Sequence, residues 1–363
     1  MFETLFIIII SAYFIQAFLL SVGAKKKFSK INEDELPKAT VIVAARNEEN
    51  NIKNCLISLS ELNYPADKLE IIIVNDHSED NTEKIIKEFI SDKPNFKTIK
   101  PIKEFKNVVG KARAIANGIE IANGEIILTT DADCIVNPDW AKTMASYYTK
   151  DVGMVCGYTN QKYKNIFEAV QDIDFIYLLT VAAGAINIWK PLSAIGNNMT
   201  YLKSAYKEVG GYENIEFSVT EDFQLLMAIH NNKKYKIIYP LDAGGLVTSA
   251  PCPDVKTLFH QKKRWAVGGM KSRLDGLFVI GTAYLAMLFC LLVPFFYSST
   301  ALVLLSFKFF TDYFMLLHIY KNLNLKLKII NFIAFEFYIT FYFVIVGISL
   351  LFNKKVLWKG REF

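Results

Sequence analysis

The chain has 363 residues, of which 52% are hydrophobic and 21% charged, and its formal net charge is +5. Its mean hydropathy of +0.23 is high for a soluble enzyme and indicates membrane segments. Few Gly and Pro, together with 28 Phe and 18 Tyr, exclude a disordered chain. The modest net charge gives no reason to expect a nucleic-acid partner. Five cysteines without a CxxC pair and four scattered histidines argue against a disulfide framework or a zinc site.

Residues 1–24 form the first apolar segment and carry a single charged side chain, Glu3. About 20 apolar residues are enough to cross the hydrocarbon core of a bilayer as a helix. A cleavable signal peptide is the alternative, because residues 22–24 resemble a cleavage site. The basic cluster Lys25–Lys27 follows the segment, however, whereas a signal peptide begins with its positive charges. We therefore expect an uncleaved anchor with these lysines on the cytoplasmic side.

The C-terminal part, residues 276–352, is expected to hold two or three transmembrane helices, followed by a basic tail over residues 353–363. The expected helices are Gly276–Phe296, Ala301–Tyr320 and Ile329–Phe352. The middle segment carries Lys308 and Asp312, which are four residues apart on one helical face and could pair. The number of crossings and the side of the C-terminus stay open.

Between these segments, residues 38–250 alternate between short apolar runs and amphipathic stretches, which predicts an α/β domain. The expected strands are Ala39–Ala44, Leu69–Val74 and Glu125–Thr130. The expected helices are Asn50–Ser60, Thr82–Ile90, Val109–Ala122 and Pro138–Tyr148. Continuous apolar strands separated by helices are typical of a mostly parallel sheet covered on both faces, whose ligands bind beyond the carboxyl ends of the strands.

Polar residues follow each of the three expected strands. These are Arg46–Glu49, Asn75–Asp80 and Asp131–Asp133. Each such turn could be merely solvated, because Asp is common in turns. Carboxylates at neighbouring strand ends would repel one another, however, unless a cation lay between them. Two acids one residue apart can hold a hard divalent ion and leave positions open for phosphate oxygens.

Four motifs give residues 38–270 a resemblance to membrane-bound family 2 glycosyltransferases, the group of cellulose, chitin and hyaluronan synthases and ceramide glucosyltransferase. They are VNDHSEDNT (74–82), TDADC (130–134), TED (220–222) and QKKRW (261–265), in the order that the family has them. TDADC matches the DxD motif of the family, and QKKRW matches its QxxRW motif. The resemblance implies a Rossmann-like GT-A fold, a nucleotide-sugar donor and inversion at the anomeric carbon. It also implies a divalent cofactor, Mg²⁺ or Mn²⁺.

The resemblance assigns donor-binding roles to Arg46, Glu48, Asp76, Lys111, Asp131, Gln261, Arg264 and Trp265. Asp76 would accept a hydrogen bond from uracil, and Arg46 would flank the base or ribose. Lys111 either contacts a phosphate or is an exposed lysine at a helix start. Asp133 is the expected metal ligand, with Asp131 either beside it on the metal or holding the ribose.

Asp222 would be the catalytic base that deprotonates the acceptor hydroxyl; its other interpretation is a carboxylate at a helix N-terminus. Gly196, Asn197, Glu221 and Trp265 are expected on the acceptor side, with Gly196 and Asn197 in a loop that precedes an amphipathic helix. The sequence departs from the family pattern at Asn75, where a second Asp is usual, and at His77, where Gly is usual.

The segment 251–275 mixes basic and apolar residues and is expected to be an amphipathic helix in the membrane interface. The resemblance, together with the small number of apolar segments, implies a hexosyl- or N-acetylhexosaminyltransferase that moves a sugar from a UDP-sugar to a lipid or lipid-linked hydroxyl. We expect a multi-pass protein of the inner membrane with its catalytic domain in the cytoplasm. A processive polysaccharide synthase acting on a glycan is the main alternative; a nucleotidyltransferase or a membrane scaffold would not need this set of motifs.

Overall fold

The computed structural model describes residues 1–105, 108–188, 190–215, 220–270 and 274–352, together with the backbone of 357–358 and 361–362. The chain divides into two compact units. Residues 26–160 and 194–250 form the unit that contains the central sheet. Residues 1–25, 161–193 and 251–363 form the other unit, which is largely helical. The rest of the expected basic tail lies outside the described residues.

A seven-stranded, mostly parallel sheet forms the centre of the first unit, in the order β3-β2-β1-β4-β8-β6-β9. The strands are β1 (Ala39–Ala45), β2 (Leu69–Asn75), β3 (Phe96–Ile99), β4 (Ile126–Asp131), β6 (Val152–Cys156), β8 (Met199–Leu202) and β9 (Lys236–Ile238). β1 pairs in parallel with β2 and with β4, whereas β8 runs antiparallel to both of its neighbours. A small second sheet joins β5 (Ile135–Val136), β10 (Val247–Ser249) and β7 (Thr159–Gln161).

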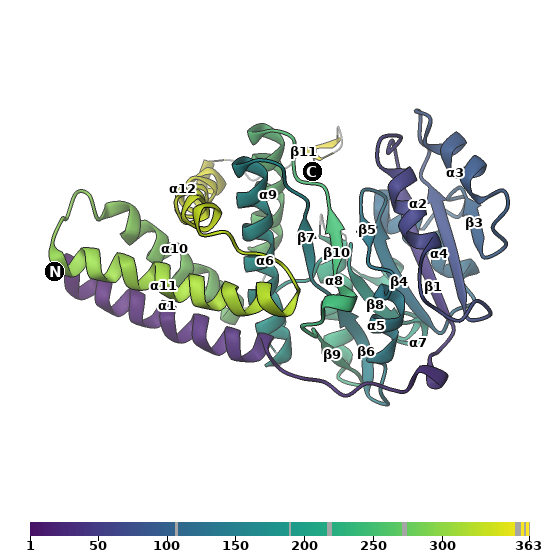
Figure 1. Ribbon diagram of the computed structural model, residues 1–363, viewed down its shortest axis with the longest axis horizontal. Helices are drawn as coiled ribbons and strands as arrows, with labels where there is room; N and C mark the ends of the chain where they lie inside the picture. Colours follow the sequence, from purple (N-terminus) through teal and green to yellow (C-terminus); the bar gives the residue numbers. More distant parts are fainter. Residues whose placement is uncertain are drawn as a thin grey trace. The chain divides into compact units, whose positions relative to one another are not determined.

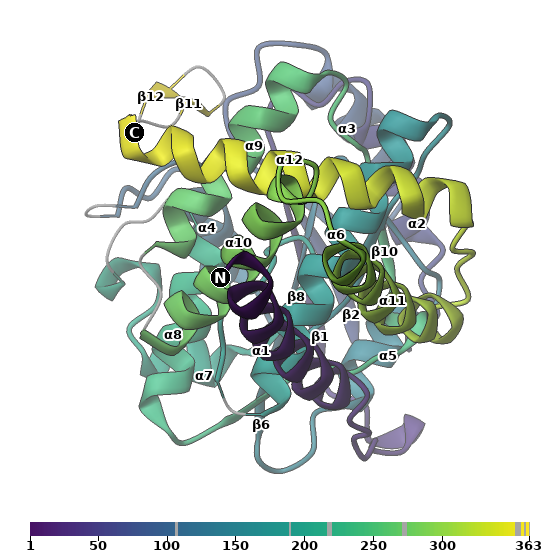
Figure 2. The ribbon, with the colours of Figure 1, turned by 90° about the vertical axis from the view of Figure 1, so that its left-hand side faces the viewer.

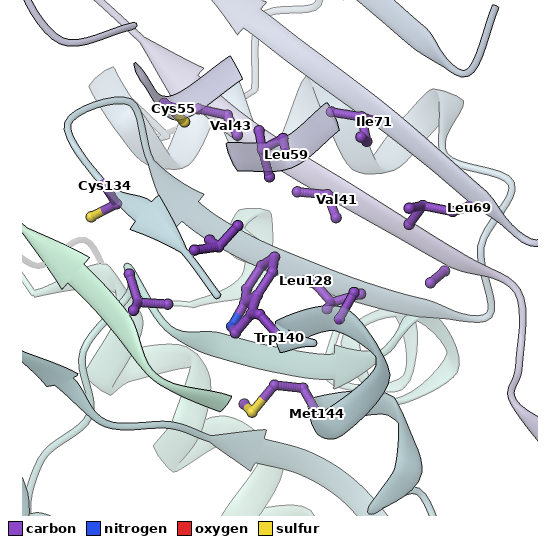
Figure 3. Packing of buried hydrophobic residues seen from close by; sticks show 14 of the residues in the cluster. Val41, Val43, Cys55, Leu59, Leu69, Ile71, Leu128, Cys134, Trp140 and Met144 are labelled. Carbon is purple, nitrogen blue, oxygen red and sulfur yellow. The ribbon is translucent and has the colours of Figure 1, made fainter. Parts of the chain in front are cut away.

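Helices cover both faces of the sheet, as the apolar strands predict (Figure 1). They are α2 (Ile52–Ser60), α3 (Thr82–Ile90), α4 (Gly110–Ile121), α5 (Trp140–Ser146), α7 (Lys203–Glu208) and α8 (Glu221–Asn232). Figure 3 shows the core on one face, where Trp140 and Met144 of α5 lie beneath Leu128 and Val41, and Leu59 of α2 lies above them. α4 packs on β1 and β2. The sheet is therefore sealed from water on both faces, which leaves its edges and strand ends for polar chemistry.

The described residues of the second unit form six helices. They are α1 (Phe2–Ala24), α6 (Ile166–Asn187), α9 (Val255–Gly269), α10 (Leu274–Leu292), α11 (Ser299–Asn322) and α12 (Ile329–Phe352). Figures 1 and 2 show α1, α10 and α11 lying side by side. Among the described residues, α1, α6, α10, α11 and α12 are long and apolar enough to cross a membrane. β11 (Leu357–Trp358) and β12 (Arg361–Glu362) form a short antiparallel pair.

The helix α6 was not among the expected elements, and it changes the expected division of the chain. The sequence predicted one soluble domain over residues 38–250, but Gln161–Ser193 clusters with the terminal helices. The apolar face of α6 is met by other helices, since 89% of its most apolar stretch is buried within the protein. Polar residues near its start, among them Asp172 and Asp174, hid this long apolar helix from a search for charge-free segments.

The charges of α11 point into the helical unit. Three charged side chains are completely buried here: Lys308 and Asp312 of α11, and Glu336 of α12. The Lys308 ammonium lies 2.9 Å from Asp312 and 2.5 Å from Glu336. The hydroxyl of Tyr13 on α1 donates a 2.7 Å hydrogen bond to Asp312. The expected pairing of Lys308 with Asp312 is confirmed. The charges that made this segment doubtful as a spanning helix are thus neutralised inside the helix bundle.

The helices α1 and α6 approach each other closely at a pair of glycines. A Cβ atom added at Gly184 would lie 2.2 Å from the carbonyl oxygen of Leu20, and one added at Gly23 would lie 2.5 Å from the carbonyl oxygen of Gly184. Only glycine permits this backbone separation. The first helix is thereby an integral part of the folded unit.

The expected interface helix over 251–275 is shorter and less uniformly exposed than its sequence indicates. α9 ends at Gly269, and residues 271–273 lie outside the described residues. Two of its basic side chains, Lys262 and Lys263, are buried, and Lys262 forms an ion pair with Asp174 of α6. These two lysines are not available to a lipid headgroup.

Candidate active site

The carboxyl ends of β1, β2 and β4 lie side by side at one edge of the sheet. In the parallel register Ala44 is opposite both Val74 and Asp131. Arg46 and Asp76, which follow β1 and β2 directly, are consequently at the same edge as Asp131. The motifs that the sequence predicted at strand ends thus share one end of the sheet, where ligands bind in open α/β folds.

The loop after β1 is fastened to the start of α3. The N–H of Glu48 donates a 2.8 Å hydrogen bond to the Thr82 hydroxyl, and its carboxylate accepts one of 2.9 Å from the Asn51 side chain. Arg46 is half-buried in the same loop. These bonds hold Glu48 where its negative charge acts on Asp133.

Asp76 is only 4% exposed, and its carboxylate accepts a 3.1 Å hydrogen bond from the Arg113 guanidinium. Arg113 lies on α4 and also binds Glu104 at 2.8 Å. Burial opposes the charge of Arg113, but these two carboxylates raise the pKa of its guanidinium above its ordinary value. Arg113 was not among the site residues predicted from the sequence. Its position two residues after Lys111, on the first turn of α4, could have indicated that it lies near the strand-end acids.

The two departures from the family pattern have structural consequences. The Asn75 amide donates to Glu83 at 3.2 Å, and its oxygen accepts from the N–H of Ser78 at 3.2 Å, so Asn75 shapes the loop after β2. His77 has a φ of +54°. This left-handed conformation is unfavourable for a side chain with a Cβ and explains why glycine suits the position.

Lys111 lies in the first turn of α4 and forms an ion pair with Asp131. Burial alone would lower the pKa of the Lys111 amine, but the carboxylates of Asp131, Glu221 and Asp222 raise it well above its ordinary value. Lys111 is thus a permanent cation among acids from two distant motifs. The alternative of a merely exposed helix-start lysine is wrong, since the side chain is 20% exposed and its ammonium is paired.

Asp133 lies in a crowded negative environment. Burial raises the pKa of its carboxyl to about 6, and the charges of Asp131 and Glu48 contribute to the shift. No cluster of three or more His, Cys, Asp or Glu that could hold a metal occurs in the described ranges. Two carboxylates nevertheless fit a divalent ion whose remaining ligands are diphosphate oxygens and water, because Mg²⁺ commonly binds in this way.

Asp222 lies in the first turn of α8, where the helix dipole favours a carboxylate. Its Oδ2 accepts a 2.7 Å hydrogen bond from the N–H of Gly196, and its Oδ1 accepts one of 2.8 Å from the N–H of Phe223. A Cβ at Gly196 would lie 3.3 Å from Asp222 Oδ2 and 3.4 Å from Lys111 Nζ. The TED and DxD motifs, about 90 residues apart in the chain, therefore meet around Lys111 and Gly196.

The loop that carries Gly196 is followed directly by the strand β8, and the helix that the sequence places after the loop, α7, begins only at Lys203. Residues 199–201 are fully buried and pair with β4 and β6. Asn197 is 6% exposed, accepts a 3.0 Å hydrogen bond from Thr159 and donates to the Cys134 thiol. Asn197 thus links this loop to the residue that follows the DxD motif.

Gln261, Arg264 and Trp265 lie on α9, in the helical unit, and all three are half-buried. The other expected site residues belong to the unit with the central sheet. Trp265 stacks on Phe175 of α6, with ring centroids 5.6 Å apart and an interplanar angle of 16°.

The fold and the strand-end site define a GT-A-like α/β protein. The mannosyltransferase PcManGT from Pyrobaculum calidifontis, solved in complex with GDP-Man and Mn²⁺, is similar to the chain with a TM-score of 0.64 at 20% sequence identity. The superposition covers 97% of this chain and 99% of that one. At this identity the likeness establishes the fold.

The family models of glycosyl transferase family 2, over residues 40–210, and of glycosyl transferase family group 2, over residues 126–353, both match. The chain belongs to the family 2 glycosyltransferases.

Two curated relatives have narrower names. The chain is 28% identical over 262 residues to a beta-monoglucosyldiacylglycerol synthase from Trichormus variabilis, covering 69% of this chain and 53% of the relative. It is 30% identical over 287 residues to a poly-beta-1,6-N-acetyl-D-glucosamine synthase from Staphylococcus aureus, covering 76% and 65%. The match thus spans between half and two thirds of these relatives.

Proposed function

We propose that the protein is an inverting glycosyltransferase that moves a hexosyl or N-acetylhexosaminyl group from a UDP-sugar to the hydroxyl of a membrane lipid. The observation that carries this proposal is the meeting of Asp131, Lys111 and Asp222 around Gly196. Direct displacement needs one base and stabilisation of the leaving diphosphate, and this arrangement supplies a carboxylate beside a cation.

Asp222 is proposed as the base. Its two backbone hydrogen bonds orient the carboxylate, and the proton of the acceptor hydroxyl would pass to it as the oxygen attacks the sugar carbon opposite the diphosphate. Glu221 precedes it at the helix start, and with Gly196 and Asn197 we assign it to the acceptor side.

Arg46, Glu48 and Asp76 are proposed to bind the nucleoside, with Asp76 held by Arg113. We propose that Lys111, which pairs with Asp131 here, would contact a phosphate of the donor. We propose that Asp133 and Asp131 hold Mg²⁺ or Mn²⁺, which would neutralise the departing diphosphate. Gln261 and Arg264 are assigned to the diphosphate, because the guanidinium fork suits it. Trp265 is assigned a stacking role toward the acceptor.

We propose that α1, α10 and α11, which lie side by side, cross the inner membrane and that the sheet unit lies in the cytoplasm, whereas α12 runs across the direction of these three helices (Figures 1 and 2). α6 cannot cross alone, because residues 160 and 194 on its two sides belong to the same compact unit. The basic cluster Lys25–Lys27 after α1 favours the cytoplasmic side for that unit. Three spanning helices leave little room for a polymer channel, which favours a lipid acceptor over a growing glycan.

The processive synthase remains a second candidate because one relative carries the name of a polysaccharide synthase. The experiment that separates the two is product length. Purified protein in vesicles, given a panel of UDP-sugars and GDP-mannose with extracted lipids, should release a nucleoside diphosphate and yield a short glycolipid. Release of pyrophosphate, or a glycosidase-sensitive polymer, would overturn the proposal. Arg264→Ala and Trp265→Ala should stay in the membrane fraction and lose transfer.

A further inference from the structure

The indole of Trp265 is held by two side chains within the helical unit. The ammonium of Lys262 lies 4.3 Å from the ring centroid, and the ring of Phe175 stacks on the indole with its centroid at 5.6 Å. Lys262 and Trp265 are three residues apart on α9, so they share one helical face. This arrangement fixes the plane of the indole from both of the elements involved, α9 and α6.

Lys262 is itself fixed by a buried acid. Its ammonium forms an ion pair with the Oδ2 atom of Asp174, to which Tyr338 of α12 donates a hydrogen bond at 3.2 Å. Lys262 is 4% exposed and Asp174 is fully buried. Asp174 directly precedes Phe175, so the same short stretch of α6 supplies the anion that holds the lysine and the ring that stacks on the indole.

The ion pair alone does not need an aromatic neighbour. A buried ion pair can hold two helices together whatever side chain lies beside it, and well-packed apolar residues in its place often stabilise a protein as much. Here the ammonium is drawn between Asp174 and the face of an indole, and a desolvated cation over Trp is the strongest form of that contact. The half-buried indole keeps part of its surface exposed.

We propose that Lys262 and Asp174 are a positioning pair that sets the orientation of Trp265 for acceptor binding. The inference rests on the proposed function, in which Trp265 stacks on the acceptor. Lys262 occupies a variable position of QxxRW, and Asp174 lies on α6, outside every motif. Neither is a catalytic residue, since both act through the indole.

The first test measures Trp265 directly and needs no substrate. Acrylamide quenching of Trp265 is obtained as the difference between each protein and the same protein carrying Trp265→Phe. Lys262→Met and Asp174→Asn should change the quenching constant at least twofold. Lys262→Arg, which keeps the positive charge, should leave the constant at the wild-type value. Lys256→Met, which removes an exposed lysine of the same helix, is the matched control and should change nothing.

A buried charge left without its partner can unfold the helical unit, so the double variant Lys262→Met/Asp174→Leu is included. It removes both charges and should remain monodisperse in detergent while showing the altered quenching. Quenching equal to the wild type in this variant would overturn the pair.

The second test is kinetic and uses vesicles that contain dioleoylglycerol, with UDP-glucose as the donor. Loss of positioning should raise the acceptor KM about tenfold and leave the donor KM within twofold. Altered quenching with an unchanged acceptor KM, or an equal rise of both KM values, would overturn the positioning role. If the wild type transfers no sugar under any donor, the proposed function fails, and the quenching comparison still decides whether the pair orients Trp265.

Discussion

The backbone N–H of Gly196 donates a 2.7 Å hydrogen bond to the Oδ2 atom of Asp222. The loop that follows α6 thus orients a carboxylate at the start of α8. With Oδ1 bound to the N–H of Phe223, the carboxylate has a defined direction before any substrate arrives. Preorganisation of this kind is what a general base requires.

We expect Asp222→Asn to preserve donor binding and to lower turnover by about 10²-fold or more, because an amide cannot take the proton. The asparagine oxygen can still accept the Gly196 bond, so the loop should keep its shape. Turnover is measured as released nucleoside diphosphate, with Glu61→Gln as an exposed control. Near-normal turnover would remove Asp222 from the mechanism.

Gly196→Ala should lower turnover about tenfold with little change in the donor KM. The added Cβ would lie 3.2 Å from the Cβ and 3.3 Å from the Oδ2 atom of Asp222, so this side chain must move by a few tenths of an ångström. Small displacements of reacting groups are costly to rate. Equal kcat for variant and wild type would mean that the carboxylate tolerates this shift.

Removal of the metal and replacement of Asp133 should have the same effect on turnover. EDTA should abolish turnover, and Asp133→Asn should do the same with metal present. In EDTA at pH 8 the variant should be more stable than the wild type by on the order of 2 kcal/mol, since it lacks a carboxylate whose pKa is raised to about 6.

The pH dependence of this stability difference has a definite sign. The folded chain binds the proton of Asp133 more tightly than the unfolded chain does. The loss of folding free energy caused by the charged carboxylate is therefore absent below about pH 4 and complete above about pH 6. Thermal unfolding in EDTA at pH 4 and pH 8 measures it. A wild type that is fully active in EDTA would contradict the assignment of the metal.

His77→Gly should stabilise the protein by about 1 kcal/mol, because it relieves a positive φ at an exposed position. Lys233, which ends α8 with a φ of +60°, offers a matched control away from the strand-end site. Lys233→Gly should give a similar gain with donor affinity unchanged. Destabilisation by His77→Gly would show that the imidazole makes compensating contacts.

Gly184→Val should destabilise the helical unit, since its side chain would collide with the backbone of α1 at Leu20. Gly281→Ala on α10 is the control, because no atom lies within 4 Å of its added Cβ, and better helix propensity should stabilise it by up to about 1 kcal/mol. Thermal aggregation in detergent compares the two. Equal stability would mean that the helices separate at little cost.

Strongly patterned elements could be predicted from the sequence. β1, β2, β4, α2, α3 and α5 lie where buried apolar runs and amphipathic periods place them, because parallel strands covered on both faces leave a continuous hydrophobic signal. β8 was not among the predicted strands. The segment has only four residues and mixes apolar with polar side chains, so that it forms a strand only because it pairs with β4 and β6.

The strand-end acids were visible in the sequence, whereas their partners were not. A motif identifies Asp76 or Asp131, but the cation that neutralises each depends on where α4 packs. Arg113 and Lys111 are on one turn of that helix and meet carboxylates from two different strands. Likewise, Asp174 becomes relevant only when α6 lies against α9, a contact between segments about 90 residues apart.

The insertion of α6 suggests how a water-soluble version of the sheet unit could be engineered. The chain leaves this unit at residue 160 and returns at residue 194, and the two crossing points are close, since Thr159 donates to Asn197 at 3.0 Å. A short Gly-Ser linker could replace residues 161–193 once the terminal segments are deleted. If residues 161–193 were kept, α6 would expose a mostly apolar surface, because the helices that bury it would be missing. We expect such a protein to aggregate.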